Sequence, residues 1–388
     1  MPIDIPLISE ELKNYLKELF GDNIAQKYLQ KIVSPMEEYS LHVYRDVSII
    51  DVILENLREN GFEARQHNDF PNMVVVSPKG PFELSLKEDS KEIVVDNRAA
   101  EMIYQGSDVF APGVKRANRV KAGDIVNIVN QNDIFVAQAE AVMSHNQMMV
   151  EKKGIAAKNI LSPYIVPSLE SLDNKSLPVY FQSLPAYLAV MNLDPQPDER
   201  ILDCCAAPGN KTLHLNELTK DQARIVAVDR SKRRIQKIQE KIETFKTSNI
   251  ITKVGNIIAL SKEWGVKFDK ILVDPPCSSL GLRPRLVHDI STNTIKSIAD
   301  YQKAIFYACD NLLKSKGILV YSTCTITKEE NEEIINYAVQ KLNYTVLEQN
   351  FMYSKADVPI GNFNFPVQRF IPGIDKTLGY FIAKLKKS

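Results

Sequence analysis

The fold is decided by residues 201–212, which read Ile201-Leu-Asp-Cys-Cys-Ala-Ala-Pro-Gly-Asn-Lys-Thr212. A short apolar run, a loop of small residues and a helical start together indicate a strand–loop–helix unit. Two further apolar runs, at 270–273 and 317–320, lead into segments that carry Cys277 and Cys324. Strand ends of one α/β sheet meet in one crevice, so we expect the loop and both thiols to share a site.

Strands and helices alternate from residue 200 to the end of the chain. This alternation is typical of an open doubly wound sheet of the Rossmann-like kind. We expect strands at 200–204, 224–229, 250–254, 269–274, 317–322, 344–348 and 379–385, and helices at about 211–218, 231–246, 295–314 and 328–342.

The N-terminal part of the chain follows other patterns. Helical spacing at 8–34 and 46–60, with short strands at 39–44, 73–76 and 82–86, predicts a small α+β unit. Alternating strands at 93–95, 125–129 and 135–142, separated by turns, predict a compact β-barrel. The predicted domains are therefore 1–90, 91–162 and 163–388, the last opening with a linker that runs to residue 178.

The composition is that of an ordinary globular protein, with 44% hydrophobic and 25% charged residues. No apolar run approaches the roughly 20 residues of a membrane span, and the N-terminus lacks a signal-peptide layout, which predicts a cytoplasmic location. There the five cysteines should be free thiols. Because they form no CxxC pair and the five histidines are scattered, we expect no metal site.

Charge is unevenly placed although the net charge is zero. Residues 1–89 carry 16 acidic against 9 basic side chains, and residues 163–388 carry 24 against 30. A polyanionic partner should therefore be held by local patches rather than by a global field.

The loop after the first strand predicts a cofactor site. Its small residues let backbone amides approach a ligand, and the following helix N-terminus favours negative charge. Asp229, at the end of the next strand, can accept hydrogen bonds from both hydroxyls of a ribose. Because the loop is not GxGxxG, S-adenosylmethionine fits better than NAD; the alternative is a plain tight turn with a helix-capping Asp.

Two cysteines beside a methyl donor suggest pyrimidine chemistry. A thiolate that adds to C6 of a pyrimidine makes C5 nucleophilic enough to accept a methyl group. Cys277 and Cys324 follow strand ends, where doubly wound sheets bind ligands. We expect Cys204 and Cys309 to pack in the core instead.

These segments resemble the Sun family of RNA (cytosine-5) methyltransferases, and the resemblance covers nearly the whole chain. It is most specific at Cys205-Ala-Ala-Pro-Gly-Asn-Lys211, Asp274-Pro-Pro-Cys277-Ser278 and Ser322-Thr323-Cys324. It extends to Gln182-Ser183, to the acidic turn 329–332 and to the segment 368–383.

The resemblance implies a role for each matching residue. The nucleophile would be Cys324, product release would be assisted by Cys277, and Asp274 would contact cytosine N3 and the exocyclic amine with Lys211 close by. The S-adenosylmethionine pocket would be lined by Cys205, Ala206, Ala207, Pro208, Gly209, Asn210, Lys211, Asp229, Arg234, Asn256 and Asp274.

Three positions depart from the family pattern. Asn210 replaces the usual second Gly of the loop, and we expect little harm because Asn tolerates left-handed dihedrals. Asn256 stands where an acidic residue is usual and could still contact the adenine amine region through its side-chain oxygen. The segment 372–375 lacks the Pro-His-x-His of bacterial members, which argues against a bacterial ribosomal enzyme.

Residues 91–162 resemble a PUA domain placed before the catalytic domain. It would interrupt an RNA-recognition-like subdomain that residues 36–89 resemble. This domain order is similar to that of the archaeal and eukaryotic enzymes that methylate cytosine 72 of the tRNA acceptor stem. The resemblance implies that the protein contacts the acceptor stem and the 3′ CCA end of tRNA. We expect the protein to be a monomer. The candidate RNA-binding residues are Lys115, Arg116, Arg119, Lys121, Lys152, Lys153, Lys158, Arg283 and Arg285; each cluster could instead be a solvated face.

Two other functions fit parts of the sequence. In an amino-group RNA methyltransferase, Asp274-Pro-Pro would cradle an adenine amine and Cys324 would not be needed. A catalytically weak tRNA-binding protein would keep the fold alone, but the presence of Asp229, Asp274, Cys277 and Cys324 argues against it.

Overall fold

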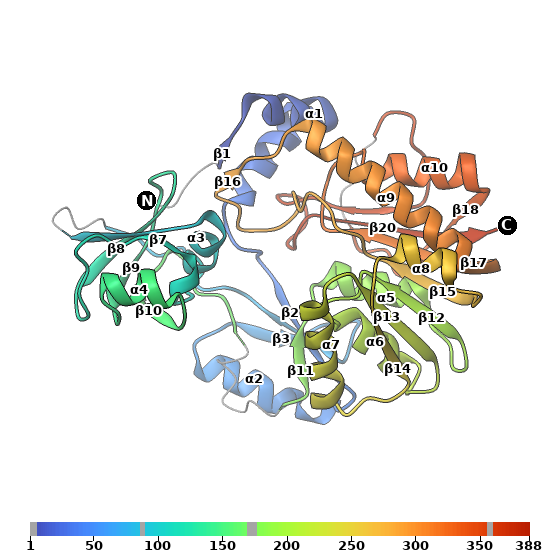
Figure 1. The fold of residues 1–388 in the computed structure, drawn as a ribbon, viewed down its shortest axis with the longest axis horizontal. Helices are drawn as coiled ribbons and strands as arrows, with labels where there is room; N and C mark the ends of the chain where they lie inside the picture. Colours follow the sequence, from blue (N-terminus) through green and yellow to red (C-terminus); the bar gives the residue numbers. More distant parts are fainter. Residues whose placement is uncertain (1–5, 86–89, 169–176, 355–359) are drawn as a thin grey trace.

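A computed structural model describes residues 6–85, 90–168, 177–354 and 360–388 of the chain. The described residues form a large sheet flanked by helices, a small sheet below it, and a separate β unit to one side (Figure 1). Helix α1 (Glu10–Ile32) lies above the large sheet, and its entry strand β1 (Leu7–Ile8) pairs with β16 (Val287–His288).

The large sheet has the strand order β14-β13-β12-β15-β17-β20-β18, with β19 paired to β20. Its first five strands are parallel, and β20 runs antiparallel to β17, β18 and β19. The chain reverses direction across the sheet beside β12, so the switch point lies between β12 and β15. The strands are β12 (Arg200–Cys204), β13 (Arg224–Asp229), β14 (Ile250–Val254), β15 (Phe268–Val273), β17 (Leu313–Thr323), β18 (Tyr344–Leu347), β19 (Gln368–Phe370) and β20 (Tyr380–Lys387).

Successive side chains of these strands point to opposite faces of the sheet and pack into two hydrophobic cores. Leu202 and Ile271 belong to the core on one face, with residues of α9 (Thr292–Leu312) and α10 (Glu332–Leu342). Ile201 and Leu272 belong to the core on the other face, with α5 (Leu184–Leu193) and α6 (Asn210–Leu218). Near-continuous apolar strands are expected of a parallel sheet covered on both faces, and this sheet is covered in that way.

The separate β unit contains a six-stranded sheet of order β6-β10-β9-β8-β5-β7. Small side chains, among them Ala139 and Ala156, fill its core. Its elements are β5 (Lys91–Val95), α3 (Asn97–Ile103), β6 (Val109–Phe110), β7 (Val114–Arg116), β8 (Ile125–Asn130), β9 (Phe135–Ala141), α4 (His145–Glu151) and β10 (Ile155–Leu161).

The small sheet has the order β11-β2-β4-β3, and α2 (Ile50–Glu59) packs on one face. Its strands are β2 (Tyr39–Val43), β3 (Ala64–Gln66), β4 (Met73–Val76) and β11 (Val179–Phe181). Because β11 follows the β unit in the chain and pairs with β2, the β unit interrupts this subdomain, as predicted.

The structure differs from the sequence-based expectations in several elements. The strand predicted at 82–86 is wrong, since residues 81–85 are irregular and residue 86 lies outside the described part. The elements that were not predicted are β1, β3, β6, β7, β10, β11, β16, β19, α3, α4, α5 and α8 (Ile257–Glu263). Gly21 (φ 76°) interrupts α1 with a kink that the helical spacing did not reveal. Over the described residues, none of the helices is both long and apolar enough to span a bilayer.

Candidate active site

The loop after β12 turns sharply into α6. Cys205 (φ 65°) and Gly209 (φ 98°) both have left-handed backbone conformations. A Cβ at Gly209 would come within 3.2 Å of Ile238 on α7 (Lys232–Thr244), so this position needs glycine for space as well as for φ. Asn210 is the first residue of α6 and does not adopt positive φ. The ability of Asn to adopt left-handed dihedrals is therefore not needed at position 210. The Asn210 side chain instead donates a hydrogen bond to the carbonyl of Phe181, 2.6 Å away.

A cavity of about 200 Å³ lies against one side of this loop. Its walls come from the loop, from the end of β11 and from the carboxyl ends of β12 and β15, at the switch point of the sheet. The lining residues are Phe181, Gln182, Ser183, Ala186, Asp203, Cys205, Ala206, Ala207, Pro208, Asn210, Lys211 and Asp274.

A second, narrower cavity lies on the other side of Cys205 and is lined by Asp229, Arg234 and Asn256. Asp229 is buried, and its Oδ1 accepts a hydrogen bond from the Ser231 amide at 2.9 Å. Its Oδ2 has no hydrogen-bond partner among the described residues, with Arg234 Nη1 3.4 Å away. A buried carboxylate oxygen left open beside a cavity fits the hydroxyls of a ribose.

Two other residues predicted to contact the cofactor, Arg234 and Asn256, make hydrogen bonds within the protein. Arg234 donates through Nη2 to the carbonyl of Ala207, 2.6 Å away, and so braces the loop. Asn256 caps α8, because its Oδ1 accepts from the amide of Ile258 at 3.0 Å. The contact expected between this oxygen and an adenine amine stays a prediction.

Lys211 and Asp274 form an ion pair at the meeting point of α6 and β15. Nζ of Lys211 lies 2.5 Å from Oδ2 of Asp274. Burial lowers the pKa of Lys211, but the neighbouring Asp274 carboxylate outweighs it and the pKa is raised. The lysine is thus a fixed positive charge beside the cavity, with the Tyr380 ring 5.9 Å away.

The two predicted thiols meet in space. Sγ of Cys277 lies 3.2 Å from Sγ of Cys324, although the residues are 47 positions apart. The hydrogen bond from Cys277 lowers the pKa of Cys324, against burial, and the same contact raises the pKa of Cys277 well above its usual range. Lys211 acts on Cys324 in the lowering direction and Asp274 in the raising direction. These directions favour Cys324 over Cys277 as the thiolate, and its role as the nucleophile stays a prediction.

A buried glutamate that sequence analysis left without a role fixes this geometry. Glu330 accepts from the Ser278 amide at 2.8 Å, from Gln302 Nε2 at 3.0 Å and from Thr327 Oγ1 at 2.8 Å. The hydroxyls of Ser278 and Thr325 lie 2.6 Å apart, next to the two cysteines in the chain. The acidic turn 329–332 is part of the family resemblance, and the fold shows that its Glu330 holds the loop that carries Cys277.

Asp203 is a second residue that the sequence analysis missed. It lies at the end of β12, lines the larger cavity, and accepts from Thr212 Oγ1 at 2.6 Å. Burial raises its pKa to about 7. A carboxylate inside an apolar strand was the available signal, since such a group is rarely buried without a function or a partner.

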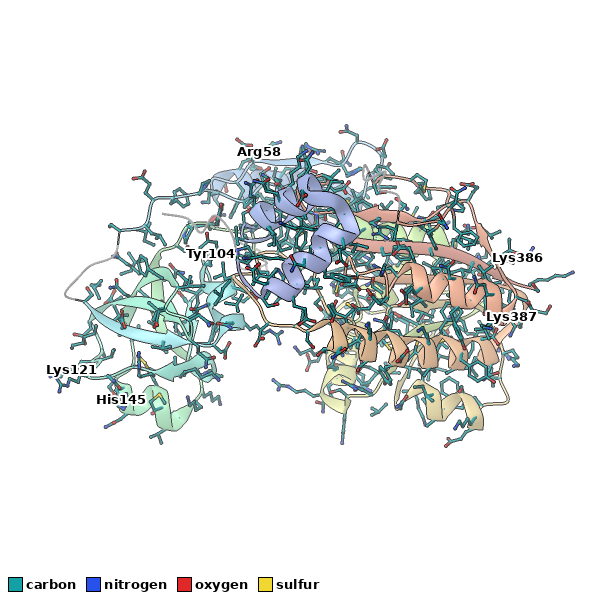
Figure 2. The ribbon with its side chains drawn as sticks, turned by 90° about the horizontal axis from the view of Figure 1, so that it is seen from above. Arg58, Tyr104, Lys121, His145, Lys386 and Lys387 are labelled. Carbon is teal, nitrogen blue, oxygen red and sulfur yellow. The ribbon has the colours of Figure 1, made fainter. Side chains whose placement is uncertain are left out.

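The predicted RNA-binding residues fall into two groups. Lys121 lies at the outer end of the β unit, far from the large sheet (Figure 2), and Arg116, Arg119, Lys153 and Lys158 are also exposed on this unit. Lys115 is exposed and lies 3.7 Å from Asp96, and Lys152 donates to the carbonyl of Val114 at 2.6 Å.

Two arginines after the first cysteine have other partners. Arg283 is buried, with Nη1 2.9 Å from Glu37, so the prediction that it contacts RNA is wrong. Arg285 is paired with Glu101 at 3.2 Å and is mostly covered. Both side chains tie the segment after Cys277 to the N-terminal units.

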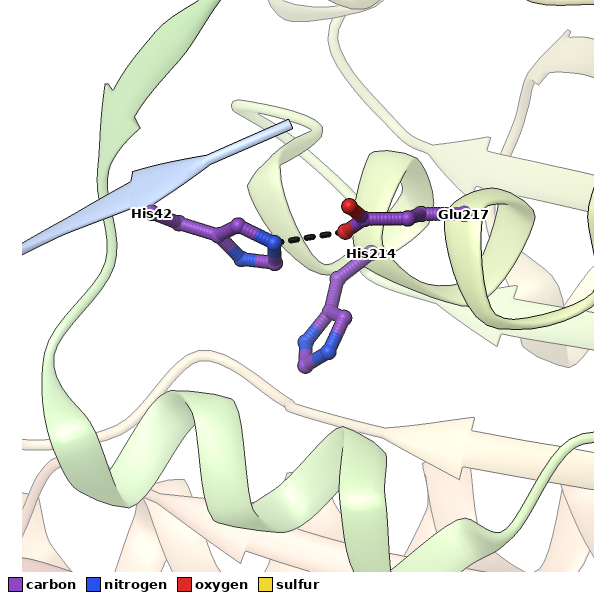
Figure 3. A group of neighbouring side chains, drawn as sticks. All are labelled: His42, His214 and Glu217. Atoms are coloured by element: carbon purple, nitrogen blue, oxygen red, sulfur yellow. Dashed lines mark hydrogen bonds and ion pairs between the residues drawn. The ribbon is translucent and has the colours of Figure 1, made fainter. Parts of the chain in front are cut away.

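The small sheet is joined to α6 by a polar cluster (Figure 3). Nε2 of His42 lies 2.5 Å from Oε2 of Glu217, and its Nδ1 lies 2.8 Å from Oε1 of Gln182. His42, His214 and Glu217 offer three possible ligand atoms within 4.8 Å of one another, so the histidines are not all scattered in space. The hydrogen bonds of His42 account for the joint without an ion, and the absence of a metal site stays a prediction.

Comparisons with known proteins agree with this geometry. A family model described as 16S rRNA methyltransferase RsmB/F matches residues 190–386, just over half of the chain, and a PUA domain model matches residues 91–161. The chain belongs to the RsmB/F, or Sun, family. The prediction of an S-adenosylmethionine-dependent RNA cytosine-C5 methyltransferase with a PUA domain is confirmed at this level.

Relatives of this RsmB/F member match it along most of its length. The tRNA (cytosine(72)-C(5))-methyltransferase of Pyrococcus horikoshii is 33% identical over 97% of this chain and 96% of that protein. The human enzyme of the same description, NSUN6, is 28% identical over 85% of this chain and 81% of its own length. The crystal structure of NSun6 from Pyrococcus horikoshii with SFG, an analogue of S-adenosylmethionine, matches with a TM-score of 0.89, 33% identity, and coverage of 98% and 99%.

S-adenosylmethionine is the cofactor of this family member, and the two cavities beside Cys205 fit it. The open oxygen of Asp229 suits its ribose, and the polar groups of the larger cavity suit the charged end of its methionine part. Both cavities are lined by Cys205, and the larger one is also lined by the Lys211–Asp274 ion pair.

Proposed function

We propose that this protein methylates C5 of cytosine 72 in the acceptor stem of tRNA. The observation that carries the proposal is the pair of thiols 3.2 Å apart, beside the Lys211–Asp274 ion pair and the donor cavities. An amino-group methyltransferase has no use for two thiols in contact. The position in tRNA is supported by the activity for which the relatives from Pyrococcus horikoshii and human are named.

Each residue in the centre has a part in the proposed reaction. S-adenosylmethionine, when bound, supplies the methyl group as an electrophile. The Cys324 thiolate forms a bond to C6 of the cytosine, and the electron pair displaced from the C5–C6 double bond makes C5 nucleophilic. Asp274 and Lys211 hold the base on its N3 and amine side, where the displaced charge is stabilised by hydrogen bonding.

Product release reverses the thiol addition. After methyl transfer C5 carries both a methyl group and a proton. A base removes that proton, the C5–C6 double bond re-forms, and the Cys324–C6 bond breaks with its electron pair returning to sulfur. Cys277, whose sulfur lies 3.2 Å from that of Cys324, assists this step.

The substrate is held mainly outside the catalytic sheet. The exposed cations of the PUA unit supply phosphate contacts, and the acceptor stem with its 3′ CCA end is the proposed ligand. The target base must leave its pair to reach Cys324, which an end-proximal pair does most readily. We propose a cytoplasmic location, because the reactive thiol pair needs a reducing compartment and a tRNA substrate is found there. That the protein acts as a monomer stays a prediction.

The experiment that tests this function is a map of 5-methylcytosine in tRNA transcripts incubated with the protein and donor. Modification of cytosine 72 alone, lost in Cys324→Ala, is the expected result. Methyl groups on an exocyclic amine, or on C5 at another position, would overturn the reaction type or the position respectively. Tight tRNA binding without any methyl transfer would favour the non-catalytic alternative.

A further inference from the structure

A cavity of about 240 Å³ lies where the small sheet meets the C-terminal segment of the methyltransferase domain. Ser40, Val75 and Arg65 form one row across its floor, because they are direct cross-strand partners on β2, β4 and β3. They lie on the sheet face opposite the one that α2 covers, since neighbouring strand residues such as Leu41 and Val74 pack with α2. The walls are formed by Leu184, Tyr353, Phe370 and residues 375–377.

Two cations border this cavity. Arg65 Nη2 and Lys376 Nζ both contact Oε1 of Glu38, at 3.3 and 3.0 Å, and their side chains are 51% and 65% exposed. The other lining carboxylate, Asp375, is buried and accepts from the amide of Ile371 through Oδ2. The two cations therefore balance the two lining carboxylates, and their exposed N–H groups remain available at the opening to contact a phosphate.

Aromatic rings form one side of the cavity. His67 and Tyr353 both line it, with ring centroids 6.1 Å apart. Both rings pack on the buried Phe70, at 4.9 and 5.4 Å between centroids, which fixes their positions. Fixed, half-buried rings beside cations are the elements that bind unstacked bases of single-stranded nucleic acid.

The cavity is one cross-strand pair away from the catalytic centre. Phe370, in its wall, is the direct partner of Tyr380 in the β19–β20 ladder. The Tyr380 hydroxyl donates to Ser322 Oγ at 3.2 Å, and Ser322 donates to Asp274 at 3.4 Å. Buried side chains thus connect the wall of this cavity to Asp274 in the catalytic centre.

We propose that this cavity is a second base pocket, which holds an unstacked nucleotide adjacent to the target cytosine. The volume favours one base over a larger ligand, since sites for drug-sized ligands begin at about 300 Å³. Tyr353 stacks on the base, and Arg65 and Lys376 contact the phosphate beside it. The pocket rests on the proposed function, and it explains how the target base is kept out of the helix: a neighbour is captured with it.

The test uses the full-length protein and an acceptor-stem RNA. Tyr353→Leu removes the ring, Tyr353→Phe keeps it, and the exposed pair Arg65→Gln and Lys376→Gln removes the cations. Arg58→Gln, on α2 at the opposite face of the same subdomain, is the matched control. Each variant is tested with RNAs in which single nucleotides next to the target are made abasic, by fluorescence anisotropy for binding and by single-turnover methyl transfer.

Tyr353→Leu should weaken binding by about 5- to 150-fold, the range found for the loss of one base–aromatic stack, while Tyr353→Phe and Arg58→Gln behave as wild type. One abasic position should cause the same loss in wild type and no further loss in Tyr353→Leu. Additive losses at every position, or an unchanged Tyr353→Leu, would overturn the pocket. Binding is measured independently of methyl transfer. If the binding losses of Tyr353→Leu and the abasic RNA are coupled but no methyl transfer occurs, the pocket stands and only the proposed function is refuted.

Discussion

Replacing Asp229 by alanine should weaken binding of S-adenosylmethionine by about 10- to 150-fold. Its buried carboxylate holds the Ser231 amide with Oδ1, whereas Oδ2, 3.4 Å from Arg234 Nη1, has no hydrogen-bond partner among the described residues. A hydrogen bond to a charged group contributes about 1.5–3 kcal/mol, and each 1.4 kcal/mol changes a dissociation constant about tenfold. The expected loss of about 10- to 150-fold corresponds to one hydrogen bond between Asp229 and a ribose hydroxyl.

Asp229 also supports the start of α7, so that contribution has to be separated. Loss of a helix-capping contact costs about 1 kcal/mol of stability and would act on the cavity indirectly. Ser231→Ala is the matched control, because its hydroxyl accepts from the Arg234 amide at the same helix start and Ser231 does not line the cavity. Ser231→Ala should lower the melting temperature slightly and leave donor affinity unchanged.

The assay is isothermal titration calorimetry with donor, alongside tRNA binding by filter retention. Asp229→Ala should lose donor affinity while tRNA binding survives, because the cations of the PUA unit are untouched. Unchanged donor affinity in Asp229→Ala, or an equal loss in Ser231→Ala, would refute the assignment of this carboxylate to the ribose.

Three further predictions follow from the charges and contacts around the site. Lys211→Ala should raise the pKa of the Cys324 thiol and Asp274→Asn should lower it, seen as opposite shifts in the pH dependence of Cys324 alkylation; shifts of the same sign would contradict the account. Burial raises the pKa of Asp203 to about 7, above its unfolded value near 3.9, so the stability contribution of this carboxyl is fully present below about pH 4 and is lost as pH rises from about 4 through about 7. Asp203→Asn should therefore gain stability relative to wild type over that range in urea unfolding, with little further gain above it, and a pH-independent difference would refute this. Removing the charges of Arg119 and Lys121 should reduce the slope of log tRNA affinity against log salt concentration by roughly 0.7–0.9 per lost phosphate contact, and an unchanged slope would mean that these residues form only a solvated face. Arg283→Gln should instead lower the free energy of unfolding by about 1–3 kcal/mol, because Arg283 is paired with Glu37.

The catalytic sheet was predictable because its local signals agree with its packing. The strands at 200–204, 224–229 and 250–254 are found at those residues. The first two are mostly buried, and apolar runs in a parallel sheet covered on both faces have sharp polar ends. The proximity of Cys277 and Cys324 was also predictable, because both residues follow the carboxyl ends of neighbouring strands.

What the sequence could not show depends on partners far along the chain. Arg283 looks like an RNA contact until Glu37, 246 positions away, is placed beside it. The contact between His42 and Glu217 and the row of Ser40, Val75 and Arg65 likewise exist only after the subdomains dock. Strand β3 has three residues with little apolar pattern, so only its pairing with β4 defines it.

The most direct test of the central claim is to trap the covalent intermediate in Cys277→Ala and identify both of its ends. The variant is incubated with donor and tRNA, denatured, digested with protease and nuclease, and analysed by mass spectrometry. The account predicts a peptide containing Cys324 joined to a methylated cytidine from position 72, and no adduct in Cys324→Ala. An adduct that survives in Cys324→Ala, or one that maps to another nucleotide, would contradict it.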